Sequence, residues 1–265
     1  MRYDVTVRLS EDQIRRYAET GYLLFEGLLD TAEVEALRAA LPEVMSRTGP
    51  EVIREQDGAG AVGVRDAPLL RTVSPAVAAA ADAEPVRQLL TDEVYLHQSR
   101  LNPKEGFGSG ARWDWHQDYS AWQRVDGMER PDCIMASVFI DDCTVERSPL
   151  LVIPRSHRHG FIDSIELHRD AKGYSLYELD RDTVARLADE NGIEPLIGGA
   201  GTVALVDCNL IHGSANNISP WRRAILYLIY NACGNACTNG DRPWFQNHRD
   251  FTPLQAIEDT ALAEG

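Results

Sequence analysis

The chain has 265 residues, of which 44% are hydrophobic and 25% charged, with a formal net charge of −15 and a pI near 4.8. These values are typical of a globular enzyme, and they allow one domain over residues 1–265. The acidic balance opposes nucleic-acid binding, because phosphates require clustered lysine and arginine. No apolar run approaches the roughly 20 residues that cross a bilayer, and the first residues lack a signal-peptide core. We therefore expect a cytoplasmic protein without a membrane segment.

The first part of the chain predicts helices around one short strand. A capping-box pattern at Ser10 precedes a helical stripe that Gly21 ends, and an apolar run over residues 22–25 reads as a strand. A second capping box begins at Asp30 and precedes another stripe of helical spacing. We expect a helical N-terminal region over about residues 9–90.

From about residue 94 the pattern changes to short β-rich runs separated by Gly, Pro and Asp. The runs lie at residues 95–101, 113–119, 134–141, 150–153, 201–207 and 223–230. Because no regular helices separate them, they predict an antiparallel double-sheet barrel over about residues 94–232 rather than a Rossmann sheet. A long segment over residues 156–199 interrupts the runs and contains one predicted helix, Asp182–Asn191. Segments of this length are usually functional, so we expect a lid over a site.

Three residues are candidate metal ligands. His116 and Asp118 lie two positions apart in an aromatic β-rich run, and His212 follows another predicted strand. Residues two apart on a strand point to the same face, so both side chains can reach one point. Two histidines and one carboxylate bind three positions of an octahedral Fe(II) and leave three for a bidentate 2-oxo acid and O2. The alternative is a pair of solvent-facing polar residues in a turn, because an HxD pattern often arises by chance.

Other polar residues near these ligands predict supporting roles. Arg223 opens an apolar run, where its planar fork suits the distal carboxylate of 2-oxoglutarate. The alternative is a surface arginine that caps the strand, as we expect for Arg222. Asp114 and Asp207 are close to the histidines in sequence and are candidates for fixing an imidazole tautomer.

At these same residues the chain resembles the phytanoyl-CoA dioxygenase superfamily, and within it the bacterial ectoine hydroxylases and the free amino-acid hydroxylases acting on proline or leucine. The likeness covers most of the chain in the same order, through the motifs GYLLFEGLLD, YLHQSRLN, WHQDYSAWQRVDGM, PLLVIPRSHRHG, HGSANNISP and RDFTPL. The block HQDYxxWxxxDGM is far more specific than HxD. The resemblance implies a double-stranded β-helix, or jelly roll, with the helical N-terminus packed outside it.

The resemblance also implies roles for individual residues. It assigns His116, Asp118 and His212 to Fe(II), Arg223, Ser214 and Asn102 to 2-oxoglutarate, Gln98 and Trp122 to the substrate, and Arg242 to a substrate carboxylate. Relatives usually read NGPL and PGSH where this chain has Arg147-Ser148-Pro149-Leu150 and Pro154-Arg155-Ser156-His157. Arg147 and Arg155 therefore leave the identity of the substrate open.

The activity that this resemblance implies is hydroxylation of a small molecule with Fe(II), 2-oxoglutarate and O2. We expect a free L-amino acid of secondary metabolism as the substrate, with an ectoine-like or other secondary metabolite as the alternative. Desaturation or ring closure by the same oxidant also stays open. Related halogenases have a small residue in place of the carboxylate, so Asp118 predicts hydroxylation. A non-catalytic cupin-like binding protein is the alternative of another class, but it would not need the clamp at Arg223.

Overall fold

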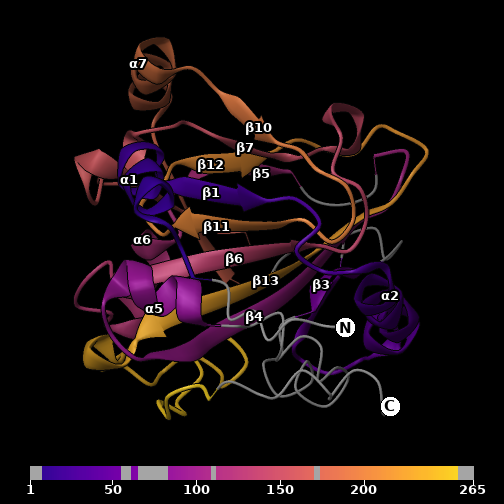
Figure 1. The fold of residues 1–265 in the computed structure, drawn as a ribbon, viewed down its shortest axis with the longest axis horizontal. Helices are drawn as coiled ribbons and strands as arrows, with labels where there is room; N and C mark the ends of the chain where they lie inside the picture. Colours follow the sequence, from indigo (N-terminus) through magenta and orange to yellow (C-terminus); the bar gives the residue numbers. More distant parts are fainter. Residues whose placement is uncertain (1–7, 55–60, 65–82, 109–111, 170–173, 256–265) are drawn as a thin grey trace.

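The computed structural model describes residues 8–54, 61–64, 83–108, 112–169 and 174–255 (Figure 1). The helices are α1 (Glu11–Thr20), α2 (Thr31–Ser46), α5 (Glu84–Leu90), α6 (Tyr119–Ala121) and α7 (Arg181–Asn191), and a π-helix follows α6 at Trp122–Asp126. Parts of the predicted N-terminal region and of the predicted lid, residues 55–60, 65–82 and 170–173, lie outside the described residues. Within the described ranges, no helix is both long and apolar enough to cross a membrane.

Two antiparallel sheets and a hairpin form the β-structure. The large sheet has the order β1 (Tyr22–Phe25), β11 (Val203–Asp207), β6 (Cys133–Phe139), β13 (Arg223–Ala232), β4 (Val94–Lys104), β3 (Ala61–Val64) and β2 (Val52–Arg54). The small sheet has the order β10 (Glu194–Leu196), β7 (Leu150–Val152), β12 (His212–Ser214) and β5 (Trp113–His116). Strands β8 (Ile165–Arg169) and β9 (Tyr174–Glu178) form the hairpin. This mainly antiparallel architecture is the predicted jelly roll, and the fold prediction is confirmed.

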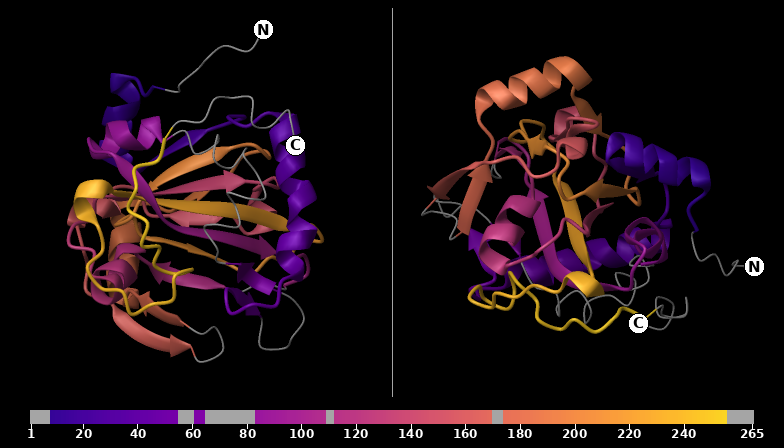
Figure 2. Two further views of the ribbon diagram at one scale, coloured as in Figure 1. Left: turned by 90° about the horizontal axis from the view of Figure 1, so that it is seen from below. Right: turned by 90° about the vertical axis from the view of Figure 1, so that its left-hand side faces the viewer.

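The central strands β6 and β13 of the large sheet are buried along their whole length, and β13 shows how its sequence achieves this. Leu226 and Leu228 belong to an outer core with Leu37 of α2, whereas Tyr227 and Ile229 face the barrel interior. Figure 2 shows α2 crossing the strand direction of this sheet. Alternate residues of one strand therefore hold the helical layer outside and line the barrel inside.

The predicted helices formed where the capping signals indicated. Ser10 accepts a hydrogen bond from the backbone of Gln13 and Asp30 accepts one from Glu33, and each N3 side chain bonds back to its cap residue. Helix α7 is also confirmed, at Arg181–Asn191. The expected helical N-terminal region also contains the strands β2 and β3, which the sequence analysis missed together with β12. It also missed β10 and the β8–β9 hairpin, so the segment 156–199 has more regular structure than predicted.

Replacing Gly201 with alanine is expected to destabilise the fold. Gly201 has a φ of +88°, and an added Cβ would lie 2.4 Å from the Leu29 carbonyl oxygen, a backbone atom. The left-handed conformation and the clash together predict a loss of about 3 kcal/mol in the free energy of unfolding. Gly108 is the matched control, because its φ is +87° and a Cβ added there would have no atom within 4 Å. Urea denaturation would contradict this prediction if Gly201→Ala lost no more stability than Gly108→Ala.

Candidate metal centre and co-substrate pocket

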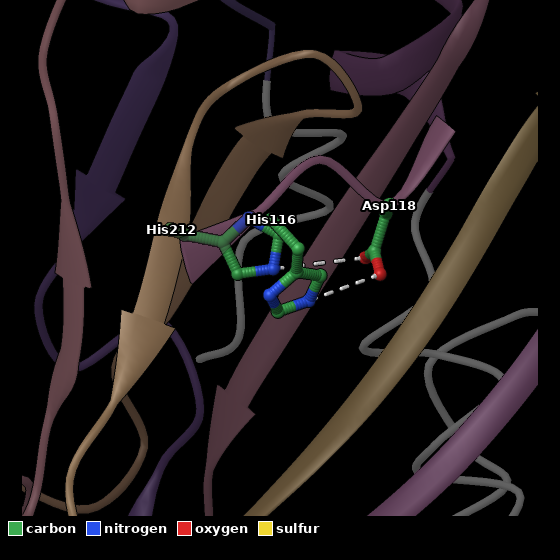
Figure 3. A group of neighbouring side chains, drawn as sticks. All are labelled: His116, Asp118 and His212. Atoms are coloured by element: carbon green, nitrogen blue, oxygen red, sulfur yellow. Dashed lines mark ion pairs between the residues drawn. The ribbon is translucent and has the colours of Figure 1, made fainter. Parts of the chain in front are cut away.

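The candidate metal ligands come together where β5 and β12 pair. His116 is the last residue of β5 and His212 the first of β12, and the two face each other directly in the antiparallel register. Their ring centroids lie 4.3 Å apart, with Asp118 beside them (Figure 3). The prediction that Asp118 shares a strand face with His116 is wrong, because β5 ends at His116. Asp118 instead has helical backbone angles, φ −62° and ψ −37°, in the turn that starts α6.

The donor atoms of this triad surround one point. The Asp118 carboxylate lies 3.8 Å from Nε2 of His116 and 4.0 Å from Nε2 of His212. Metal bonds of about 2.1 Å place ligand atoms between about 3.0 and 4.2 Å apart, so both separations fit a single ion. All three side chains are buried.

Hydrogen bonds on the far side of each imidazole fix the tautomer that metal binding needs. Nδ1 of His116 lies 2.6 Å from the carbonyl oxygen of Asp114, and Nδ1 of His212 lies 2.9 Å from that of Leu210. Because Nδ1–H donates to a carbonyl, Nε2 keeps its lone pair toward the shared point. Asp114 therefore fixes an imidazole tautomer as expected, but it does so through its backbone carbonyl rather than its carboxylate. Asp207 bonds to Tyr17 and to the backbone of Asn209 instead.

Electrostatics keep His116 and Asp118 in their metal-binding protonation states. Burial, followed by the neighbouring His212, lowers the pKa of His116 to about 4. Burial alone would raise the pKa of Asp118, but Arg100 and the two imidazoles hold it well below its usual range. At neutral pH the site therefore offers a neutral His116 and an ionised carboxylate, which are the forms that bind a cation.

Arg100, which the sequence analysis did not single out, orients the carboxylate ligand. Its Nη2 donates to Oδ2 of Asp118 at 3.0 Å, and its guanidinium lies 5.4 Å from the centre of the Tyr227 ring. Arg100 and the predicted Asn102 both line the same pocket from β4, where residues two apart share a face. This alternation could have identified Arg100 as a pocket residue from the sequence, because Arg100 lies between the predicted site residues Gln98 and Asn102.

His116 and His212 line a pocket that also contains three cationic side chains. It is lined by Arg100, Asn102, Lys104, Trp113, His116, Met135, Leu150, His212, Ser214, Arg223 and Tyr227. The predicted 2-oxoglutarate contacts Arg223, Ser214 and Asn102 therefore lie together. Their roles stay a prediction.

Arg223 is only 1% exposed, yet not every nitrogen of its guanidinium group forms a hydrogen bond. Nε and Nη2 both donate to the carbonyl oxygen of Ser148, at 3.1 and 2.8 Å. Nη1 has no hydrogen-bond partner among the described residues. A buried guanidinium nitrogen without a partner is costly and suits an incoming carboxylate.

Lys104 adds a second cation at this end of the pocket. It faces Arg223 directly across the β4–β13 pair and is 2% exposed. Its Nζ donates to Oγ of Ser214 at 2.8 Å, to Oγ of Ser148 at 3.1 Å and to the carbonyl oxygen of Ala215. The sequence analysis missed it, because a lysine near a strand end usually points to solvent.

The predicted substrate residues lie outside this lining. Gln98 donates from Nε2 to the carbonyl oxygen of Gln246 at 2.9 Å, and Trp122 is 2% exposed in the π-helix. Arg242 forms a fork with the carboxylate of Asp126. The substrate roles of Gln98, Trp122 and Arg242 stay predictions.

The two arginines that depart from the family pattern have partners of their own. Arg147 lies 5.0 Å from the centre of the Trp221 ring and 3.7 Å from the carboxylate of Asp142. Arg155 has a φ of +67° and reaches Glu19 at 3.2 Å. Neither arginine lines the pocket in the described part of the chain.

Comparisons with known proteins agree with this site. The chain is 37% identical to the ectoine dioxygenase of Bordetella bronchiseptica over 240 residues, covering 86% of this chain and 77% of that protein. It is 33% identical to the L-proline trans-4-hydroxylase of Streptomyces griseoviridis over 261 residues, covering 92% and 94%. The crystal structure of EctD from S. alaskensis with 2-oxoglutarate and 5-hydroxyectoine superimposes with a TM-score of 0.79 at 31% identity, covering 97% and 89%. The family model of phytanoyl-CoA dioxygenase (PhyH) matches residues 17–225, and the chain belongs to this family.

Proposed function

We propose that this protein hydroxylates a free L-amino acid of secondary metabolism in the cytoplasm. Its family membership makes it a 2-oxoglutarate-dependent dioxygenase. In this assignment His116, Asp118 and His212 hold Fe(II), as their donor spacing and fixed tautomers support. The bound iron supplies activation of O2, with 2-oxoglutarate as the co-substrate that is oxidised to succinate and CO2.

The observation that carries the co-substrate assignment is a buried guanidinium nitrogen, Nη1 of Arg223, that has no hydrogen-bond partner among the described residues. Arg100, Lys104 and Arg223 line the pocket, whereas Asp118 is the carboxylate beside it that Arg100 already binds. A buried guanidinium nitrogen without a partner is costly, so the end of the pocket that Arg223 shares with Lys104 favours an anionic ligand. 2-Oxoglutarate is a dianion whose two carboxylates are separated by a short chain. One carboxylate can reach the iron, while the other contacts Lys104 and Arg223.

Each pocket residue then has a distinct task. Nη1 of Arg223 binds the distal carboxylate of 2-oxoglutarate, and Lys104, Ser214 and Asn102 complete the contacts at that end. Arg100 holds the Asp118 carboxylate in place. The apolar side chains of Met135 and Leu150 reduce water access, which favours coupled oxidation of the substrate.

The substrate proposal rests on resemblance to two groups of relatives. The motifs HQDYSAW and RDFTPL favour a free amino acid, and the similar proline hydroxylase supports a substrate of this class. The second candidate is ectoine or a related metabolite, which the 37% identity to an ectoine dioxygenase favours. Because ectoine is a cyclic amino-acid derivative, both candidates offer a carboxylate and an aliphatic C–H bond.

A substrate panel tests this proposal. Protein loaded anaerobically with Fe(II) receives 2-oxoglutarate, O2 and one compound at a time from the free L-amino acids and ectoine. Succinate is measured together with any product one oxygen heavier. Coupled product from an amino acid supports the proposal, and coupled product from ectoine alone supports the second candidate. Absence of succinate with every compound would contradict the proposed activity.

Replacing Lys104 with methionine is expected to weaken 2-oxoglutarate binding. Methionine fills much of the same volume but removes a charged donor, which is typically worth about 1.5–3 kcal/mol, or roughly 10- to 100-fold in affinity. Anaerobic titration of the Fe(II) protein with 2-oxoglutarate, followed by visible absorption, measures the effect. Iron stoichiometry should stay at the parent value. Unchanged 2-oxoglutarate affinity would remove Lys104 from the clamp.

A further inference from the structure

A buried arginine–carboxylate fork lies outside the co-substrate pocket. Asp126, the last residue of the π-helix, is 0% exposed. Its Oδ1 accepts a hydrogen bond from Nε of Arg242 at 2.6 Å, and its Oδ2 accepts one from Nη2. Nε2 of His97 lies 3.3 Å from the same Oδ2. One carboxylate thus joins the π-helix, β4 and the C-terminal part of the chain.

Residues 238–248, here called the C-terminal strap, are anchored around this carboxylate. The backbone nitrogen of Asn239 donates to the carbonyl oxygen of Asp126 at 2.9 Å, and its side chain donates to that of Val125 at 2.7 Å. At the other end, the backbone nitrogen of His248 donates to the carbonyl oxygen of His97 at 3.1 Å. The strap is part of the yellow end of the chain in Figure 2.

A β-bulge brings His97 into this junction. In the β4–β13 pair, Gln98 lies opposite Ile229 and Leu96 lies opposite Tyr230, which leaves His97 without a facing residue. A bulge re-aims the side chain of the extra residue, and bulges often occur next to active sites. The His97 ring is fully buried and meets the Trp122 ring edge-on, with centroids 5.6 Å apart.

The junction contacts two of the residues that the family resemblance assigns to the substrate. Trp122 begins the π-helix that Asp126 ends, and its ring packs on His97. Gln98 follows His97 and donates to the carbonyl oxygen of Gln246 in the strap at 2.9 Å. π-Helical turns are rare and occur frequently at functional sites.

We propose that Asp126 is a positioning residue, whose fork with Arg242 fastens the C-terminal strap and thereby sets the orientation of Trp122 and Gln98 toward the substrate. This inference rests on the proposed function and on the substrate roles that the family resemblance implies for Trp122 and Gln98. Nε and Nη2 of Arg242 are engaged by Asp126, so the main contribution of Arg242 is to hold the strap. A buried ion pair of this kind fixes one arrangement at the cost of desolvation.

The test compares two junction variants with a matched control. Asp126→Asn removes the charge without changing the shape of the side chain. Arg242→Lys is the milder second variant, because it removes the fork and keeps the positive charge. Asp163→Asn is the matched control. It removes the ion-pair partner of Arg124, a residue of the same π-helix, but this pair is at the surface, because the Asp163 side chain is 93% exposed. Any effect specific to the buried junction should be absent from this control.

Each protein is assayed with the substrate that the parent enzyme hydroxylates. A positioning role predicts that both junction variants raise the substrate KM about tenfold and form less product per succinate, while 2-oxoglutarate affinity changes less than about twofold. A residue that only stabilises the fold would not change this coupling ratio in soluble, iron-loaded protein. Hydrogen–deuterium exchange should become faster in the strap and in the π-helix, but not in β5 or β12.

The outcomes separate this inference from the proposed function. If the parent couples succinate to product and both junction variants keep its substrate KM and coupling ratio, the positioning role is overturned and the proposed function stands. Unchanged exchange in the strap would likewise overturn it. If the parent forms no product from any compound on the panel, the proposed function fails first and the positioning role fails with it.

Discussion

Replacing Asp118 with alanine is expected to abolish iron binding and product formation. The substitution removes one of three candidate ligands and the only carboxylate of the described triad, leaving two imidazoles for a hard cation. We expect product formation to fall at least about 100-fold, because changing even a partner of a metal ligand typically costs 10- to 100-fold. Iron stoichiometry after anaerobic loading and product per minute measure the two effects.

The matched control for this variant is Asp132→Ala. The Asp132 carboxylate is partly exposed and pairs with Arg130, so its loss should leave iron content and turnover near the parent values. Asp118→Ala also leaves the buried Arg100 without its carboxylate partner, which predicts a loss of about 3–5 kcal/mol in unfolding free energy. Circular dichroism at the assay temperature separates lost iron from lost fold. Hydroxylation by folded Asp118→Ala at the parent rate would show that the triad is wrong.

Replacing Arg223 with methionine is expected to raise the 2-oxoglutarate requirement sharply. Truncating one partner of a buried, hydrogen-bonded charge pair costs about 2–5 kcal/mol, which corresponds to roughly 30-fold or more in the KM for 2-oxoglutarate. Iron binding should persist, because Arg223 is not among the triad. The measurement is succinate formation over a range of 2-oxoglutarate concentrations.

Arg222 supplies the control for this position. It is adjacent in sequence, but its fork binds Asp141 at 2.8 and 3.2 Å and its side chain is 36% exposed. Arg222→Met should therefore lower stability without changing the 2-oxoglutarate requirement. If Arg223→Met and Arg222→Met gave the same co-substrate dependence, the carboxylate clamp would have to lie elsewhere.

Local signals made much of the fold predictable from the sequence. The capping boxes at Ser10 and Asp30 marked helix starts that the structure confirms, because each satisfies backbone groups within a few residues. The apolar run after Arg223 became β13, which is buried along its whole length. Such features depend on neighbours in sequence, and the jelly-roll class followed from their order.

Features set by distant contacts were not predictable in the same way. Strand β12 has three residues and owes its conformation to β5 and β7 on either side. Asp118 reaches the histidines from a turn, although the strand rule used to predict their convergence does not apply there. Arg100 and Lys104 are buried charged residues in an inward-facing row. Their burial is explained by the groups they contact, the Asp118 carboxylate for Arg100 and the Ser148 and Ser214 hydroxyls for Lys104, rather than by local pattern.

The segment between residues 156 and 199 also protects the sheet that carries the histidines from self-association. Strand β5 is an edge strand, and the backbone nitrogen of Leu179 donates to the carbonyl oxygen of Trp115 on it at 3.0 Å. At the opposite edge, β10 covers β7 with a strand of three residues that contains Pro195. Short, proline-containing edges and occupied edge carbonyls are the devices by which proteins resist strand addition from a second copy. Shortening this segment would therefore expose a template for aggregation next to the candidate metal ligands.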